Sequence, residues 1–241
     1  MPRDKLTKFH NKFSEEAEEV ITKFFPEKVA ELDGLLKSGQ FSMTKIPEVH
    51  SKSIIPISHP KDGKYNDVDK HTNKKRKLSH GEEIEQMAEL VAVDLVPCNQ
   101  FIQDLVILLK PNIQILMEKC NMIKMWIQLL IPRIEDGNNF GVSIQEEALS
   151  EVQRIEGEAA SFLDQIARYF VTRGKIISKV VKYPQLEDYR HAVQELDEKE
   201  FISLRLCCCE LRNHYLILHD TITKNMEKIK KPRSNNAETL Y

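Results

Sequence analysis

The feature that most constrains the fold is an apolar pattern that runs without a break from residue 99 to residue 130. Its side chains recur at steps of three and four, the spacing of one face of an α-helix. This first stripe consists of Ile102, Leu105, Leu109, Ile113, Leu116, Cys120, Ile123, Ile127 and Leu130. A second stripe beside it consists of Leu108, Ile115, Met122, Trp126 and Leu129. Because a surface helix of a monomer carries one stripe, this helix is either central to its own bundle or packed against a second subunit.

Three other segments share the helical periodicity, and together with the first they predict an all-α fold. They span residues 1–39, 143–183 and 187–230. Long helices joined by short turns pack side by side as antiparallel neighbours. We therefore expect the protomer to be a long up-down four-helix bundle.

Proline, glycine and a capping motif indicate where the helices begin and end. Pro26 should kink or break the first helix, because it lacks an amide proton and its ring clashes with the preceding turn. Gly39 stands where a C-cap is expected. Ser143 and Glu146 match a capping box, which predicts that the third helix begins there. Pro184 should end that helix.

These signals divide the chain into four parts. Residues 1–39 form the first helix of the bundle, and residues 98–233 form the other three helices of the same domain. Between them, residues 40–97 lose the periodicity and are punctuated by prolines, which predicts a flexible linker. Residues 234–241 form a polar C-terminal tail.

Composition and charge exclude several classes of protein. The 241 residues include 35 Lys and Arg against 37 Asp and Glu, a net charge of -2, so no overall field favours nucleic acid or a membrane surface. No apolar run is long enough to cross a bilayer, and no signal-peptide core follows the N-terminus. We interpret the five cysteines as reduced thiols in a cytosolic or nuclear protein.

A compact basic cluster lies within the predicted linker and consists of Lys74, Lys75, Arg76 and Lys77. Clustered cations in an accessible segment bind acidic surfaces and are typical of nuclear-import signals. The alternative is a solvated run of charge without a partner. The cluster therefore makes nuclear localisation a hypothesis, with some protein in the cytoplasm.

The sequence contains none of the common catalytic or nucleotide-binding motifs, so we expect neither an enzyme nor a cofactor. Cys207, Cys208 and Cys209 are adjacent on a predicted helix and point about 100° apart, so they cannot converge on one metal ion. We expect them to fill the core. Glu135 and Asp136 are the one conceivable metal or acid–base pair, and no His or Cys stands near them in sequence.

The stretch from residue 131 to residue 145 joins the two best-patterned helices and is rich in Gly and Asn. Gly137 and Gly141 permit a positive φ, and Asn138 and Asn139 tolerate one. One interpretation is an ordinary helix–helix connection. The other is a functional loop, because such loops tend to be held at both ends by rigid elements.

Four runs of residues then carry a resemblance to a known family. They are WIQLLIPRIEDGNNFGV at 126–142, DEKE at 197–200, LRN at 211–213 and KKPR at 230–233. On these runs, the chain from residue 110 to residue 231 resembles the 11S (REG) family of proteasome activators. The basic cluster and the sequence NAETLY at 236–241 are similar to those of the gamma, nuclear type of subunit.

The resemblance implies a ring of seven protomers with a central pore, docked on the α-subunit ring of the core proteasome. The second stripe of the helix at 99–130 should then lie at least partly in a subunit interface. The family's activation loop corresponds to Arg133, Ile134, Glu135, Asp136, Gly137, Asn138, Asn139, Phe140 and Gly141. Its docking tail corresponds to Ala237, Glu238, Thr239, Leu240 and Tyr241.

The function implied is a non-catalytic activator, independent of ATP, that docks by its tails and opens the gate with the loop 133–142. It would stimulate peptide hydrolysis and the degradation of some nuclear proteins. Lys175 is a candidate for a pore-side residue that selects the stimulated peptidase site, although it equally complements a helix dipole. The alternative function is a nuclear helical adaptor that recruits partners without gating.

Overall fold

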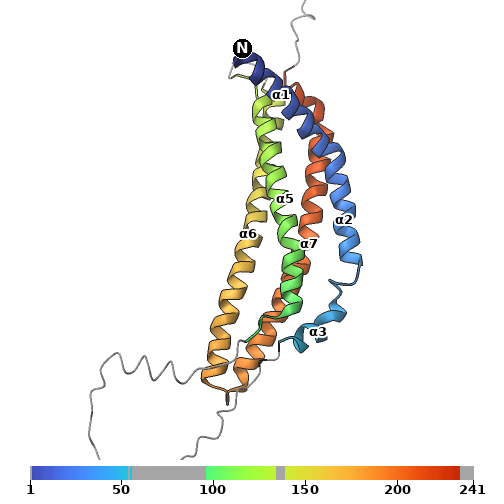
Figure 1. The fold of residues 1–241 in the computed structure, drawn as a ribbon. Coiled ribbons are helices and arrows are strands. Elements are labelled where there is room, and N and C mark those ends of the chain that lie inside the picture. The colour runs from blue at the N-terminus through green and yellow to red at the C-terminus, as the bar shows by residue number, and fades with distance from the viewer. Residues whose placement is uncertain (1, 54, 56–95, 134–138, 234–241) are drawn as a thin grey trace, which may run out of the picture.

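Four long helical segments run alternately down and up the bundle in the computed structural model (Figure 1). The structure describes residues 2–53, 55, 96–133 and 139–233. The segments are α1–η1–α2 (Pro2–Glu19, Val20–Phe24 and Phe25–Lys37), α5 (Gln100–Leu130), α6 (Phe140–Lys182) and α7 (Glu187–Lys230). The predicted all-α, up-down arrangement is confirmed, and the predicted bounds of α7 agree with the structure.

The first segment stays helical through Pro26, where the sequence predicts a kink or a break. Five residues of π-helix, η1, immediately precede α2, and Pro26 lies in the first turn of α2. The backbone angles of Phe24 and Phe25 are both helical, so the helix continues from η1 into α2 and the predicted break is wrong. Gly39 follows the end of α2 with a φ of 87°, which confirms the predicted C-terminal glycine.

The predicted linker at 40–97 is wrong over its first part. A short 3-10 helix, η2 (Met43–Lys45), leads into α3 (Ile46–Ser51), which packs against α7 and α5. Phe41 and Val49 are fully buried, and this burial holds a segment too short to show periodicity in the sequence. The rest of the predicted linker, with the basic cluster Lys74–Lys77, lies outside the described residues apart from Ile55, Val96 and Pro97.

The start of α6 also differs from the prediction. The helix begins at Phe140, with Asn139 as its N-cap residue, so the capping box at Ser143 and Glu146 is wrong. Ser143 lies in the first turn instead, and its hydroxyl donates a hydrogen bond of 2.7 Å to the carbonyl of Phe140. The predicted end is confirmed, because Tyr183 leaves the helical conformation just before Pro184.

The core forms around α5, whose first stripe is buried from Ile102 to Ile127. Trp126 of the second stripe is also buried, with 1% exposed, and its indole nitrogen donates a 3.0 Å hydrogen bond to Ser14 on α1. Trp126 therefore belongs to the core of the protomer and not to a subunit surface. The subunit interface stays a prediction for Leu129, which is 44% exposed, and for the half-buried Leu108, Ile115 and Met122.

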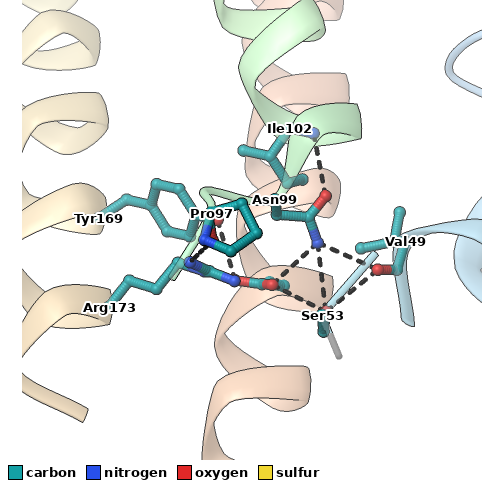
Figure 2. Close-up of polar contacts among 8 residues, drawn as sticks. Val49, Ser53, Pro97, Asn99, Ile102, Tyr169 and Arg173 are labelled. Carbon is teal, nitrogen blue, oxygen red and sulfur yellow. Dashed lines mark hydrogen bonds and ion pairs between the residues drawn. The ribbon is translucent and has the colours of Figure 1, made fainter. Parts of the chain in front are cut away.

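A buried carboxylate on α7 holds the lower end of the bundle (Figure 2). Asp197 is fully buried, and its Oδ1 accepts hydrogen bonds of 2.9 Å from both the Tyr169 hydroxyl and Arg173 Nε. Its Oδ2 accepts 2.7 Å from the Ser53 hydroxyl and 2.8 Å from Asn99 Nδ2. A buried charge is tolerated only when it is paired and hydrogen-bonded in this way.

The Asp197 cluster joins parts of the chain that are far apart in sequence. Asn99 caps α5 by accepting a hydrogen bond from the amide of Ile102, and it also donates to the carbonyl of Val49 at the end of α3. Arg173 of α6 donates to the carbonyl of Pro97. The cluster thus fixes the start of α5 against α3, α6 and α7.

Replacing Asp197 with Asn should strongly destabilise the protein, because the change leaves the buried guanidinium of Arg173 without its counter-charge. We expect the free energy of unfolding to fall by about 3 kcal/mol in urea titrations followed by circular dichroism. Asp220→Asn is the matched control, since Asp220 forms an exposed pair with Lys224. This change should hardly alter the free energy of unfolding. Equal midpoints for the two variants would contradict this role of Asp197.

Glu200 should make stability depend on pH. Burial raises its pKa from 4.5 to about 7, with Lys199 opposing and Asp197 adding to the shift. Between these values the folded chain keeps a proton that the unfolded chain releases, so raising the pH destabilises the fold. Relative to the wild type, Glu200→Gln should gain stability as the pH rises through this window and then level off. If the difference in unfolding free energy between Glu200→Gln and the wild type stayed constant between pH 4.5 and about 7, the raised pKa of Glu200 would be wrong.

Candidate functional site

The candidate site lies at the upper end of the bundle in Figure 1, where α5 ends, α6 begins and α7 ends. The described chain stops at Arg133 and resumes at Asn139, and it ends at Arg233 just before the tail. The structure therefore brings four predicted loop residues, Arg133, Asn139, Phe140 and Gly141, to the base of the tail. The other predicted members lie outside the described residues: Ile134, Glu135, Asp136, Gly137, Asn138, Ala237, Glu238, Thr239, Leu240 and Tyr241.

The backbone of α6 approaches the end of α7 closely at Gly141. A Cβ atom at this position would overlap the backbone of Pro232, including its carbonyl oxygen. Gly141 is helical, so the glycine is needed for this close approach and not for the positive φ that the sequence suggested. The start of α6 and the base of the tail are in direct contact here.

Gln145 ties three helix ends together. The side chain is fully buried, and its Nε2 donates hydrogen bonds of 3.0 Å to the carbonyl of Leu130 and 2.7 Å to the carbonyl of Ile229. These carbonyls belong to the last turns of α5 and α7, where helices leave backbone acceptors without partners. One amide group from the second turn of α6 therefore satisfies acceptors of two other helices.

Arg233 closes the arrangement from the tail side. Its Nη1 donates to the carbonyl of Arg133 at 3.3 Å, and its Nη2 donates to Asn139 Oδ1 at 3.2 Å. The guanidinium thus bridges the two residues that flank the undescribed part of the loop. We call the whole set the loop–tail junction, which consists of Arg133, Asn139, Gly141, Gln145, Pro232 and Arg233.

Two other predicted residues are exposed. Phe140 has 68% of its surface exposed at the start of α6, beside the loop–tail junction. Lys175 is exposed near the opposite end of α6, so the structure does not bring it to the loop. The pore-side role of Lys175 stays a prediction.

The buried cysteines are inert packing groups. Cys207 and Cys208 are buried and Cys209 is half-buried, so the predicted core-filling role is confirmed for the first two. Burial raises the pKa of both buried thiols, and that of Cys120, to about 12, which keeps them protonated.

Within the described ranges, no group of three or more His, Cys, Asp or Glu side chains could hold a metal ion. No helix described by the structure is long and apolar enough to span a membrane.

Two residues that the structure makes important were not predicted from the sequence. Asp197 lies four residues after Val193 and four before Phe201, so its charge falls on an apolar helix face. This spacing could have predicted a buried carboxylate. Gln145 offered no comparable signal, since a polar residue near a helix start is ordinary. Its role depends on the distant carbonyls of Leu130 and Ile229.

Comparison with known proteins finds two family models that match the chain. The family model described as "Proteasome activator PA28, C-terminal" matches residues 95–239, and "Proteasome activator PA28, N-terminal" matches residues 2–60. The proteins named "Proteasome activator complex subunit 3" from Gallus gallus and Homo sapiens are each 50% identical over 241 residues, covering 98% of this chain and 95% of theirs.

Solved structures show the same fold. The crystal structure of the 11S subunit of the Plasmodium falciparum proteasome, PA28, is 31% identical and has a TM-score of 0.76, covering 96% of this chain and 91% of that one. The activator PA26 from Trypanosoma brucei, solved in complex with the 20S proteasome from yeast, is 11% identical with a TM-score of 0.60 over 98% of both chains. The second likeness concerns the fold alone.

These matches define an all-helical activator subunit of the 11S type. The chain belongs to the PA28 family of proteasome activators. The family resemblance predicted from the sequence is thereby confirmed, and its gamma type agrees with the subunit 3 name of the relatives.

Gly141 should be intolerant of a side chain although it lies in a helix. Gly141→Ala forces the start of α6 away from the backbone of Pro232 and should lower the melting temperature. Gly157→Ala is the matched control on α6, because a Cβ there meets nothing within 4 Å. That control should stabilise the protein by about 0.5–1 kcal/mol, the helix preference of Ala over Gly. If both variants stabilised the fold, the close approach at Gly141 would be wrong.

Proposed function

We propose that this protein is a non-catalytic activator of the core proteasome that works without ATP. Its C-terminal tails dock on the α-subunit ring, and its loops at 133–142 open the gate. The observation that carries this proposal is the loop–tail junction, which holds both ends of the loop beside the base of the tail. Docking and gating segments would then face the proteasome from the same end of the bundle.

The active form we propose is a homo-heptameric ring with a central pore. The resemblance to the 11S family implies the ring of seven. Large apolar side chains left exposed on α5 and α7 support burial against neighbouring copies. They are Ile107, Met125, Leu129, Leu206, Leu216 and Ile217.

The finer points of the proposal concern location and specificity. Nuclear import through Lys74–Lys77 rests on the basic cluster and on the gamma-type resemblance, with some protein remaining in the cytoplasm. Lys175, exposed on α6, is proposed to face the pore. Proteins degraded in the nucleus would be the clients. An adaptor role, the alternative from the sequence, would need neither the ring nor the loop.

The proposal is tested by mixing the purified protein with core proteasome and a fluorogenic peptide, without ATP. Peptide hydrolysis should rise, and native mass spectrometry should show seven copies of the 28.0 kDa chain. A chelator should leave the stimulation unchanged, since no metal chemistry is invoked. A monomer or dimer that leaves hydrolysis at its basal rate would favour the adaptor.

Deleting Leu240 and Tyr241 should abolish binding to the core proteasome and leave the ring intact, because both residues lie beyond the last packed helix. The loss should be steep, since several weakly binding tails act together in one ring. Binding is measured by co-sedimentation or surface plasmon resonance, and assembly by native mass. Unchanged affinity of the truncated ring would exclude the tail as the anchor.

Replacing Asn138 with Tyr should separate docking from gating. Asn138 follows Gly137 in the loop, where a small polar side chain tolerates a positive φ and a bulky ring does not. The variant should assemble, bind the proteasome and compete with the wild type, yet fail to stimulate hydrolysis. Asn11→Tyr, the same change at an exposed position of α1, is the control for bulk alone. Full stimulation by Asn138→Tyr would make the loop a mere connection.

A further inference from the structure

We infer that Gln145 and Arg233 are positioning residues that couple tail docking to the activation loop within each protomer. Together they hold the two ends of the loop and the base of the tail as one unit, so that a docked tail sets where the loop stands over the gate. This inference rests on the proposed function and adds to it a physical link between the two segments.

Gln145 supplies the buried half of the link. Its amide nitrogen serves the last residue of α5, from which the loop departs, and the end of α7, from which the tail departs. Its Oε1 is also buried and has no hydrogen-bond partner among the described residues. The two hydrogen bonds that the nitrogen donates set the orientation of the side chain. The same side chain thereby holds Leu130, where the loop begins, and Ile229, near the base of the tail.

Arg233 supplies the outer half of the link. It stands three residues after the end of α7 and reaches both flanks of the loop, Arg133 and Asn139. The planar fork of a guanidinium can donate from two nitrogens at once, which a single ammonium nitrogen cannot do with the same geometry. A force on the tail therefore reaches the loop through one side chain.

The contact between Gly141 and Pro232 makes the link stiff. Because backbone meets backbone there, no side-chain rotation can absorb a displacement of the tail relative to α6. The three connections enclose the first turns of α6 between the ends of α5 and α7. Loosening them should leave the tail able to dock but the loop less well placed, so the effect should appear in gating and not in affinity.

The experiment titrates core proteasome with each activator variant and follows fluorogenic peptide hydrolysis. Two quantities are read, the maximal stimulated rate and the activator concentration that gives half of it. The variants are Gln145→Met, which keeps the side-chain length but loses both donated bonds, Arg233→Ala and Arg233→Lys. Matched controls on the exposed face of α6 are Gln165→Met and Arg168→Ala. Native mass and thermal melting are recorded for every ring.

For Gln145→Met and Arg233→Ala, we expect the maximal rate to fall by at least about five-fold, because each variant loses two hydrogen bonds and one alone is worth about that factor. Half-saturation should change less than about two-fold. Arg233→Lys should recover part of the maximum, and both controls should match the wild type. A purely structural role would instead lower the melting temperature or the ring mass in proportion to the lost rate.

If the wild type is active and both Arg233→Ala and Gln145→Met reach its maximal rate, the inference is wrong but the proposed function stands. A shift confined to half-saturation also overturns it, because the residues would then serve docking only. If Gln145→Met fails to assemble, the exposed Arg233→Ala decides by itself. An inactive wild type overturns the proposed function and the inference with it.

Discussion

The burial of α5 is the constraint on which the other helices depend. Its first stripe is covered by α6, α7 and the segment that includes α1, and Trp126 on its second stripe is covered as well. At ~2 kcal/mol for each large apolar side chain removed from water, this one helix contributes much of the driving force for folding. Both α6 and α7 pack against α5 and cover it.

Polar groups then fix the two ends of this apolar helix. At its start, Asn99 caps α5 and joins the Asp197 cluster, which brings in α3, α6 and α7. At its end, the carbonyl of Leu130 is held by Gln145. These directional bonds add to side-chain packing in setting the axial register of the helices. A defined register is what places the loop and the tail at one height, as a docking surface requires.

Some helix bounds were predictable from the sequence where a long helical period ended beside a proline, although Pro26 and the capping box at Ser143 gave wrong predictions. The ends of α7 and the exit of α6 before Pro184 are examples. Short elements and tertiary bonds were not predictable. The six residues of α3 are held by burial at Phe41 and Val49 rather than by a repeat. The sequence predicts that α6 begins at Ser143, whereas it begins at Phe140. Its first turn packs against Pro232, and this contact joins residues far apart in the chain.

The candidate site was predictable as a segment but not as a mechanism. The resemblance marked the loop and the tail, whereas the junction between them became visible only in the folded chain. The most direct test is a cryo-electron microscopy structure of this protein bound to the core proteasome. We expect a ring of seven protomers with the loop–tail junction, and Arg233 in particular, facing the α-subunits. A complex in which the opposite end, near α3, faces the proteasome would contradict it.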